Sequence, residues 1–216
     1  MLGELESIEI GAPLLLMQSN GGLTTVERAA AAPCQIIESG PAGGVVGAHA
    51  LATKLGLGDI VTLDMGGTST DVCMVTEGKA QLTQEYSIDG LPIRIPLIDI
   101  HTIGAGGGSV VWVDDGGMLR IGPHSSGADP GPACYGRGGE EPTLTDAHVI
   151  RNTVRPEAFL GGRMEIFADR SHTALQPVAE LLGMSLEDAA DSAIQLANAN
   201  VVRAIQLIST ERGFDP

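Results

Sequence analysis

The chain has 216 residues, a length typical of one domain or of one and a half small ones. Apolar residues make up 43% of it and charged residues 18%, which favours a packed core over disorder. It carries 27 Asp and Glu against 12 Lys and Arg, a net charge of −15, and has one Trp, two Tyr and three Phe. Because such a charge repels phosphate backbones and anionic lipid, and because aromatic platforms for bases are scarce, the composition argues against nucleic-acid binding and against a role at a membrane surface.

The cysteines and the first residues indicate a cytoplasmic protein. Cys34, Cys73 and Cys134 are odd in number and widely spaced, which fits reduced thiols better than a disulfide framework or a zinc site. The N-terminal segment lacks the basic start and long apolar run of a signal peptide. No stretch approaches the ~18 apolar residues of a membrane span. We therefore expect a cytoplasmic location and no membrane association.

The N-terminal part of the chain predicts alternating strands and helices. Thr24 and Thr25 can cap a helix, Glu27 stands three residues after Thr24, and Pro33 would end that helix. The β-branched pair Ile36-Ile37 predicts a strand, because β-branched side chains suit a pleated surface. The expected elements are a strand over residues 13–17, a helix over 24–32, a strand over 34–38, a turn over 39–44 and a helix over 45–55.

The middle of the chain is rich in predicted strands. Gly66-Gly67 and Asp115-Gly116-Gly117 mark tight turns between apolar segments. Residues 122–142 are rich in Gly, Pro and Ser, and a loop of about 20 residues in a compact domain is usually functional when it is ordered. The expected strands cover residues 59–64, 70–75, 79–87, 91–100, 109–114 and 118–121.

Helical periodicity begins at Thr143. Thr143 with Asp146 predicts one helix start, and Ser185 with Asp188 predicts another. We expect helices over 143–154, 174–182 and 185–211. The layout predicts an α/β fold with α+β character in the C-terminal part. It forms a single domain over residues 1–216, made of a β-rich portion (13–121), a Gly/Pro-rich loop (122–142) and a helical portion (143–216).

The segment between Val61 and Val72 carries the strongest chemical pattern. An apolar strand leads to Asp64, two glycines turn the chain, three hydroxyl residues follow, and Asp71 re-enters a strand. Glycines let backbone N–H groups approach an anion closely, and hydroxyls can donate to phosphoryl oxygens. Two carboxylates beside a phosphate suit a hard cation such as Mg²⁺ between them. The segment therefore predicts a phosphate-binding loop of Gly66, Gly67, Thr68, Ser69 and Thr70; a plain hairpin turn with solvated hydroxyls is the alternative.

This segment resembles the phosphate motif of the actin-like ATPase superfamily, and Asp64–Val72 resembles the second-half motif of the hydantoinase A/5-oxoprolinase family. Four further segments agree with the family in the same order along the chain, and the resemblance runs from about Pro13 to Pro216. These segments cover residues 39–44, 100–109, 127–136 and 143–147.

The resemblance implies an actin-like or ribonuclease H-like lobe with a mixed β-sheet, binding ATP and Mg²⁺. It implies ATP-driven opening of a cyclic amide of hydantoin or 5-oxoproline type, while relatives in the family carboxylate ketones. It also favours a role beside the nucleotide for Gly43 and Gly44; a tight strand-to-helix turn is the alternative. Gly106 and Gly107 belong to a glycine-rich stretch that either lies against nucleotide or substrate or simply connects strands. Neither this stretch nor any other matches a dinucleotide fingerprint or a P-loop.

Candidate metal and proton-transfer residues lie near the glycine-rich stretches. Asp99, His101, Asp129, Asp146 and His148 offer the oxygen and imidazole groups that such sites use, although most such residues serve as turn or helix caps. We select His101 and Asp129, with Asp64 and Asp71, as the catalytic candidates. Cys134 is expected to serve packing rather than nucleophilic catalysis, because Arg137 is the one positive residue near it.

Two features depart from the family pattern. The chain holds one Asp-x-Gly-Gly-Thr loop, whereas an actin-like ATPase closes two lobes on its nucleotide, and the glycine-rich adenosine segment of the family is missing after Pro216. We therefore expect a partial chain that needs the missing lobe, together with a hydantoinase B-type subunit or domain, and that has little ATPase activity alone. A subunit of an ATP-dependent ketone carboxylase, or a non-catalytic remnant that binds a partner, are the alternatives.

Overall fold

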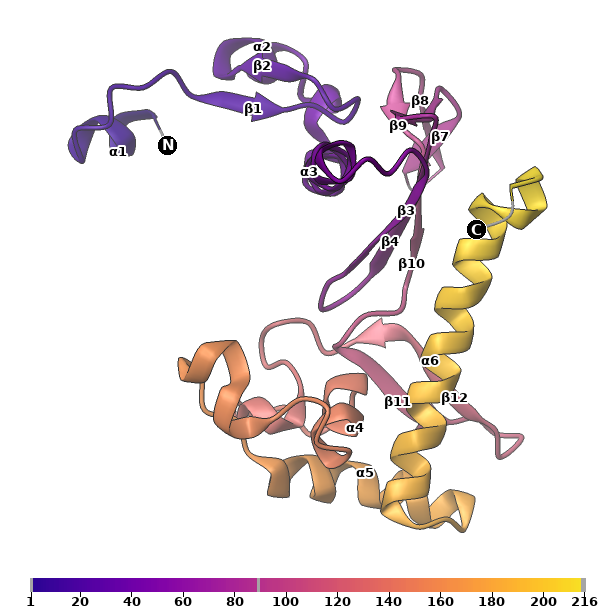
Figure 1. Ribbon diagram of the computed structural model, residues 1–216. Helices are drawn as coiled ribbons and strands as arrows, with labels where there is room; N and C mark the ends of the chain where they lie inside the picture. Colours follow the sequence, from indigo (N-terminus) through magenta and orange to yellow (C-terminus); the bar gives the residue numbers. More distant parts are fainter. Residues whose placement is uncertain (1, 89, 215–216) are drawn as a thin grey trace. The chain divides into compact units, whose positions relative to one another are not determined.

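A computed structural model describes residues 2–88 and 90–214 and divides them into two compact units (Figure 1). The first unit is formed by the residues up to Asp64 together with Val72–His101. The second is formed by Met65–Asp71 together with the residues from Thr102 onward. The single-domain organisation predicted for residues 1–216 stays a prediction.

The first unit begins with a short helix and a two-stranded sheet. Helix α1 (Leu2–Ser7) precedes strands β1 (Leu15–Met17) and β2 (Leu23–Thr25), which pair antiparallel. Helix α2 (Val26–Ala31) then starts two residues later than predicted, because Thr24 is held in the sheet opposite Leu16. Thr25 takes the capping position instead, and its hydroxyl accepts the N–H of Arg28 at 3.4 Å.

The strand predicted over residues 34–38 is wrong. Residues Pro33–Ile36 form a 3₁₀ helix, η1, and helix α3 (Ser39–Lys54) begins soon after it. Pro33 presets the helical φ at the first position of η1. The backbone groups that a strand would pair laterally are taken by Ser19, whose N–H donates to the Gln35 carbonyl and whose hydroxyl accepts the Glu38 N–H. Residues 39–44, predicted as a turn before a helix, are therefore already helical.

A sheet of four strands carries the predicted glycine turn. Strands β3 (Ile60–Met65) and β4 (Thr70–Thr76) confirm the predicted hairpin, and β10 (Ile100–Ile103) lies on the other side of β4. Strand β5 (Lys79–Ala80) pairs antiparallel with β4. In the first unit α3 packs on this sheet through a core of Ala42, Val45, Cys73, Val75 and Ile98. The sheet strands run on from the first unit into the second, so the turn itself belongs to the second unit.

The two long strands predicted over residues 79–87 and 91–100 are replaced by shorter ones. Strands β6 (Leu82–Thr83) and β9 (Leu97–Ile98) pair with each other, as do β7 (Tyr86–Ile88) and β8 (Leu91–Ile93). Pro92 and Pro96 have no N–H to donate, so a continuous ladder through this segment would lose hydrogen bonds.

The second unit combines a hairpin with three helices. Strands β11 (Ser109–Val113) and β12 (Leu119–Ser125) pair antiparallel and confirm the predicted hairpin, with β12 ending four residues later than expected. Three of its helices are α4 (Leu144–Ile150), α5 (Ala168–Leu182) and α6 (Leu186–Ile208). Short 3₁₀ helices occur at η2 (Ala133–Tyr135), η3 (Pro156–Gly162) and η4 (Thr210–Arg212). Helix α5 starts six residues before the predicted position.

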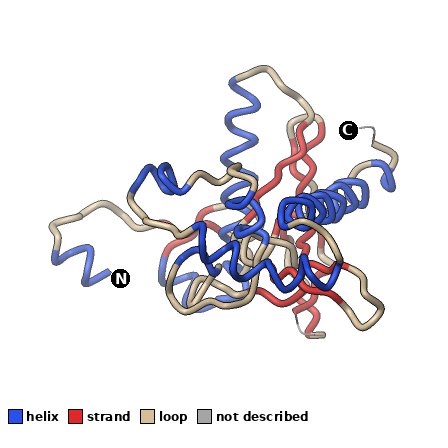
Figure 2. Tube along the Cα trace, turned by 90° about the horizontal axis from the view of Figure 1, so that it is seen from below, coloured by secondary structure: helices blue, strands red, loops and turns tan. Residues whose placement is uncertain are grey.

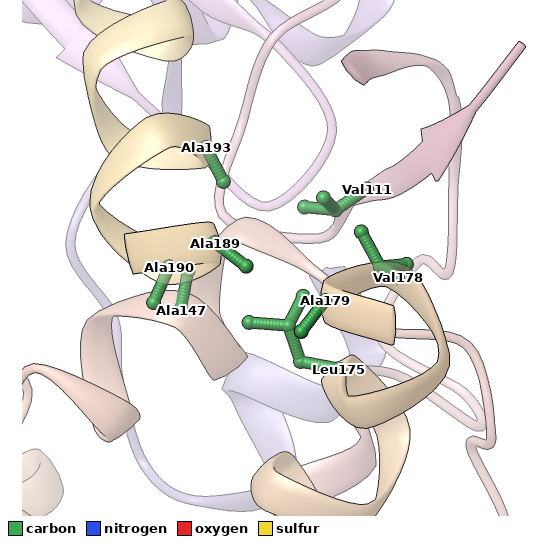
Figure 3. Packing of buried hydrophobic residues seen from close by; sticks show 8 residues of the cluster. All are labelled: Val111, Ala147, Leu175, Val178, Ala179, Ala189, Ala190 and Ala193. Atoms are coloured by element: carbon green, nitrogen blue, oxygen red, sulfur yellow. The ribbon is translucent and has the colours of Figure 1, made fainter. Parts of the chain in front are cut away.

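The core of the second unit is built largely from alanines. Figure 3 shows Ala189 and Ala193 of α6 beside Val111 of β11, with Leu175 and Val178 of α5 closing the cluster. Alanines at this contact let neighbouring helices approach closely, and the larger buried side chains come from α5 and from Val111 of the hairpin. Ser185 caps α6 as predicted, accepting the Asp188 N–H at 3.1 Å.

The predicted mixed α/β class is confirmed (Figure 2). Among the described residues, no helix has both the length and the apolarity that crossing a bilayer demands.

Candidate phosphate-binding site

The loop between β3 and β4 exposes a row of backbone N–H groups. Gly66, Gly67 and Thr68 are exposed, Ser69 is half-buried, and Gly66 closes the turn by donating to the Ser69 carbonyl at 2.8 Å. Within the described part of the chain, the amides of Gly67, Thr68 and Ser69 donate to no protein acceptor. Successive free amides in a turn form a concavity that attracts anions.

A glycine segment beneath the loop fixes the direction of these amides. The N–H of Gly107 donates to the Gly66 carbonyl at 3.0 Å, and the N–H of Gly108 donates to the Gly67 carbonyl at 2.6 Å. In a trans peptide the carbonyl and the following N–H point in opposite directions. Because both carbonyls face the glycine segment, the N–H groups of Gly67 and Thr68 point away from it.

Glycine is required in the supporting segment by close backbone approach. A Cβ on Gly106 would lie 2.7 Å from the Gly66 carbonyl oxygen, and one on Gly108 would lie 2.9 Å from the Gly67 oxygen. A Cβ on Gly107 would lie 2.9 Å from the Thr145 hydroxyl, which donates to the Gly107 carbonyl at 2.8 Å. The glycine-rich stretch is therefore packed against the loop rather than serving as a slack connection.

The hydroxyl residues of the loop have different surroundings. Thr70 is fully buried, and its hydroxyl donates to the Ala105 carbonyl, so its proton is engaged in anchoring the loop. Thr68 lies at the exposed tip, where its hydroxyl accepts from Ser125 at 3.4 Å. Thr68 and Ser69 are therefore the two hydroxyls of the loop that remain open to a ligand.

Sequence reasoning missed Ser125, the last residue of β12, and Ser126, the residue that follows it. Ser126 donates from both its N–H and its hydroxyl to the Gly108 carbonyl, at 2.9 and 3.2 Å. These serines stand more than 50 residues after Thr68, and only the hairpin return brings them near. The sequence feature that could have pointed to these two serines is their position just before the motif at residues 127–136.

The carboxylate candidates are placed in different units. Asp71 belongs to the second unit, is half-buried, and accepts the Thr102 hydroxyl at 2.6 Å on one carboxylate oxygen. Asp64 is exposed in the first unit, where a Cβ on Gly44 would lie 3.5 Å from its carboxylate. Among the described residues, no three His, Cys, Asp or Glu side chains are grouped to hold a metal ion.

The remaining candidate residues are divided between the two units. Gly43 and Gly44 sit within α3 and His101 on β10, all in the first unit. Asp129 is exposed in the second unit and has no polar partner within the described residues. The structure therefore brings together the Gly66–Thr70 loop with Gly106 and Gly107, and places Gly44 beside Asp64.

Cys134 and Asp146 are buried inside the second unit. Burial raises the pKa of the Cys134 thiol to about 12, so it is protonated at neutral pH. Asp146 is fully buried and forms a capping box with Thr143.

Comparison with known proteins finds a matching family and several related enzymes. A model of the hydantoinase/oxoprolinase family matches residues 3–216. The chain is 40% identical over 211 residues to caprolactamase subunit alpha of Pseudomonas jessenii, covering 96% of this chain and 30% of that protein. It is 35% identical over 210 residues to 5-oxoprolinase of Saccharomyces cerevisiae, covering 91% and 16%. A nucleotide-free structure of an acetone carboxylase with an ATP-dependent mechanism matches with a TM-score of 0.89 at 30% identity, covering 100% of this chain and 31% of that one. The chain thus spans 16% to 31% of the length of these relatives.

Proposed function

Because the chain belongs to the hydantoinase/oxoprolinase family, we propose that it is the ATP-binding part of an ATP-dependent hydrolase that opens a cyclic amide. The amide is of hydantoin or 5-oxoproline type. The proposal includes Mg²⁺ as the cation, a cytoplasmic location, and a B-type subunit and the second lobe of the fold as partners. Relatives described as subunits, and the small share of their length that this chain spans, support the need for partners.

The outward direction of the Gly67 and Thr68 amides carries this proposal. Both amides are exposed, both are held by peptides whose carbonyls are bonded to the glycine segment, and Gly67 has no atom within 4 Å of the place a Cβ would take. A phosphoryl group can therefore approach the loop without displacing a side chain. The donors of the loop are neutral N–H and hydroxyl groups. Such groups can bind phosphoryl oxygens even though the chain as a whole is negatively charged.

Each residue of the loop has a proposed role in binding. The amides of Gly67, Thr68 and Ser69 hold phosphoryl oxygens, and Thr68 and Ser69 add their hydroxyls. Asp71, whose carboxylate accepts the Thr102 hydroxyl, would be one residue that holds Mg²⁺, and Asp64 is the second proposed carboxylate. When bound, ATP supplies the phosphoryl group that makes the amide carbonyl reactive. His101 and Asp129 are proposed for proton transfer at the substrate.

A subunit of an ATP-dependent ketone carboxylase is the second candidate function. The TM-score of 0.89 with the acetone carboxylase structure supports it. Labelled bicarbonate separates the two functions in the complete protein, because only a carboxylase incorporates the label into its product.

Binding of ATP by the chain tests the proposal. We expect calorimetric titration with ATP to show binding that strengthens with Mg²⁺, while the chain alone turns ATP over slowly or not at all. Thr68→Ala is expected to weaken binding about fivefold, and Asp71→Asn to reduce the Mg²⁺ effect. Asp115→Asn, at an exposed hairpin turn of the same unit, also removes one negative charge. It is expected to change neither ATP binding nor the effect of Mg²⁺ on it. Equal effects of the two Asp substitutions would show that the loop is not the nucleotide site.

A further inference from the structure

A small cavity lies on the side of the glycine segment that faces helix α6. Its volume is about 220 Å³, below the ~300–1,000 Å³ typical of drug-sized ligands, so it suits a compact molecule. All of its lining residues belong to the second unit. They are Ile103, Gly104 and Ala105 at the end of β10, and Asn200, Arg203, Ala204 and Leu207 on α6.

Arg203 brings an uncompensated positive charge to this cavity. Within the described part of the chain its guanidinium has no ion-pair or hydrogen-bond partner, whereas Arg120 and Arg151 are paired with Asp114 and Asp191. None of the residues three and four positions away on α6 is acidic: they are Ala199, Asn200, Gln206 and Leu207. The charge of Arg203 therefore stays available to an anionic ligand, even in a chain with 27 acidic residues.

Asn200 stands one helical turn from Arg203 and lines the same cavity. It is half-buried, and its amide makes no hydrogen bond to any described residue. A guanidinium and an amide at i and i+3 share one helix face, so both can donate to one ligand. Ile103, Ala204 and Leu207 supply an apolar wall beside these two donors. The lining therefore combines oxyanion recognition with a small apolar surface.

The cavity and the phosphate loop share one support. Ala105 lines the cavity, is 3% exposed, and accepts the Thr70 hydroxyl through its carbonyl. The next residue, Gly106, packs directly under Gly66. A ligand in the cavity would thus contact the same short segment that orients the loop amides.

We propose that this cavity binds the carboxylate group of the second reactant, either a cyclic amide that bears a carboxylate or bicarbonate. The inference rests on the proposed function, since the phosphoryl groups are assigned to the Gly66–Thr70 loop. The planar fork of Arg203 fits a carboxylate through two N–H groups, Asn200 adds a third donor, and the apolar wall accommodates a compact carbon skeleton.

The experiment titrates the chain with four probes: 5-oxoproline, 2-pyrrolidinone (the same ring without the carboxylate), bicarbonate and inorganic phosphate. We expect 5-oxoproline or bicarbonate to bind, and Arg203→Ala to weaken that binding about tenfold or more. Asn200→Ala should weaken it severalfold. 2-Pyrrolidinone should respond to neither substitution. Arg155→Ala, which removes an exposed arginine of the same unit outside the cavity, is the matched control.

Three results would overturn the inference: no binding of either carboxylate probe, equal losses for Arg203→Ala and Arg155→Ala, or an Arg203 effect confined to phosphate. Thermal melting of each variant shows whether the fold is intact. Titration with ATP and Mg²⁺ on the same samples keeps the two proposals apart. Carboxylate binding that depends on Arg203 without ATP binding would refute the proposed function and leave the cavity assignment standing.

Discussion

At the tip of the β3–β4 hairpin, single atoms decide whether the loop can bind an anion. The carbonyls of Gly66 and Gly67 are bonded to Gly107 and Gly108, and this arrangement turns the following amides outward. It depends on the absence of a Cβ at Gly106, which would fall within 2.8 Å of both Gly67 carbonyl atoms. The site thus depends on backbone packing as much as on its hydroxyls.

Gly106→Ala is predicted to displace the loop. Because the new methyl group would meet backbone atoms that cannot rotate away, we expect a loss of about 1–3 kcal/mol in stability and weaker ATP binding. Urea unfolding and ATP titration measure the two effects. Gly47→Ala is the control: it lies inside α3 with no atom within 4 Å of the added Cβ, and it should stabilise the chain by about 0.5–1 kcal/mol. Equal stability changes at the two positions would contradict the close approach.

His148 is predicted to make stability depend on pH. Burial lowers the pKa of His148 below its ordinary value of 6.5, and its Nδ1 lies 2.7 Å from the Thr153 hydroxyl oxygen. The unfolded chain therefore binds a proton at His148 more readily than the folded chain does. The stabilisation associated with neutral His148 is thus present above pH 6.5 and is lost as the pH falls below it. Urea midpoints at about pH 7.5 and about pH 5.5 should differ less in His148→Gln than in the native chain. His172→Gln, at an exposed histidine of the same unit, should keep the full difference.

At the scale of elements, one buried carboxylate joins three pieces of the second unit. Asp146 of α4 accepts the N–H groups of Ala133 and Cys134 from η2, at 3.2 and 2.9 Å, and the Ser171 hydroxyl of α5 at 2.7 Å. It also accepts the N–H and hydroxyl of Thr143 at 2.9 and 2.7 Å. This network explains why the glycine- and proline-rich segment before α4 has a defined path.

Asp146→Asn is predicted to destabilise the second unit strongly. The amide nitrogen would turn its own N–H groups toward donors in a buried site, so we expect a loss of about 3 kcal/mol or more in the free energy of unfolding. Denaturant titration measures this loss. Asp188→Asn changes the exposed cap of α6, where Ser185 donates to the carboxylate at 2.7 Å, and should cost about 0.5–1 kcal/mol. Similar losses for both variants would argue against the network.

Local patterns predicted the elements that local chemistry determines. The β3–β4 turn, the β11–β12 hairpin and the Ser185 cap follow from residues within a few positions of one another. The strand expected over residues 34–38 failed because Ser19, distant in sequence, takes up the backbone groups of that segment. Likewise, the proposed phosphate loop was predicted from its own residues, whereas its support by Gly106–Gly108 and Ser125 arises from tertiary packing. The Asn200–Arg203 pair gave no signal before α6 was placed beside the end of β10.

At the scale of the whole molecule, the net charge of −15 acts on any anionic ligand. ATP and its Mg²⁺ complex are negative, so diffusional approach is opposed by the field of the chain. Raising the NaCl concentration from about 0.02 to 0.2 M shortens the screening length from roughly 20 Å to 7 Å, which weakens this repulsion. We predict that the association rate of a fluorescent ATP analogue, measured by stopped flow, increases over this range. A decrease would mean that local positive charge governs the encounter.

The path of the chain has a practical consequence. It crosses from one unit to the other after Asp64, after Asp71 and after His101, so each unit is assembled from separate stretches. A protease that cuts after His101 yields one fragment that holds both stretches of the first unit together with Met65–Asp71, and a second fragment that lacks this loop of the second unit. No single cut therefore frees one unit from residues of the other, and expressing either unit without those residues would require joining its stretches in a new gene.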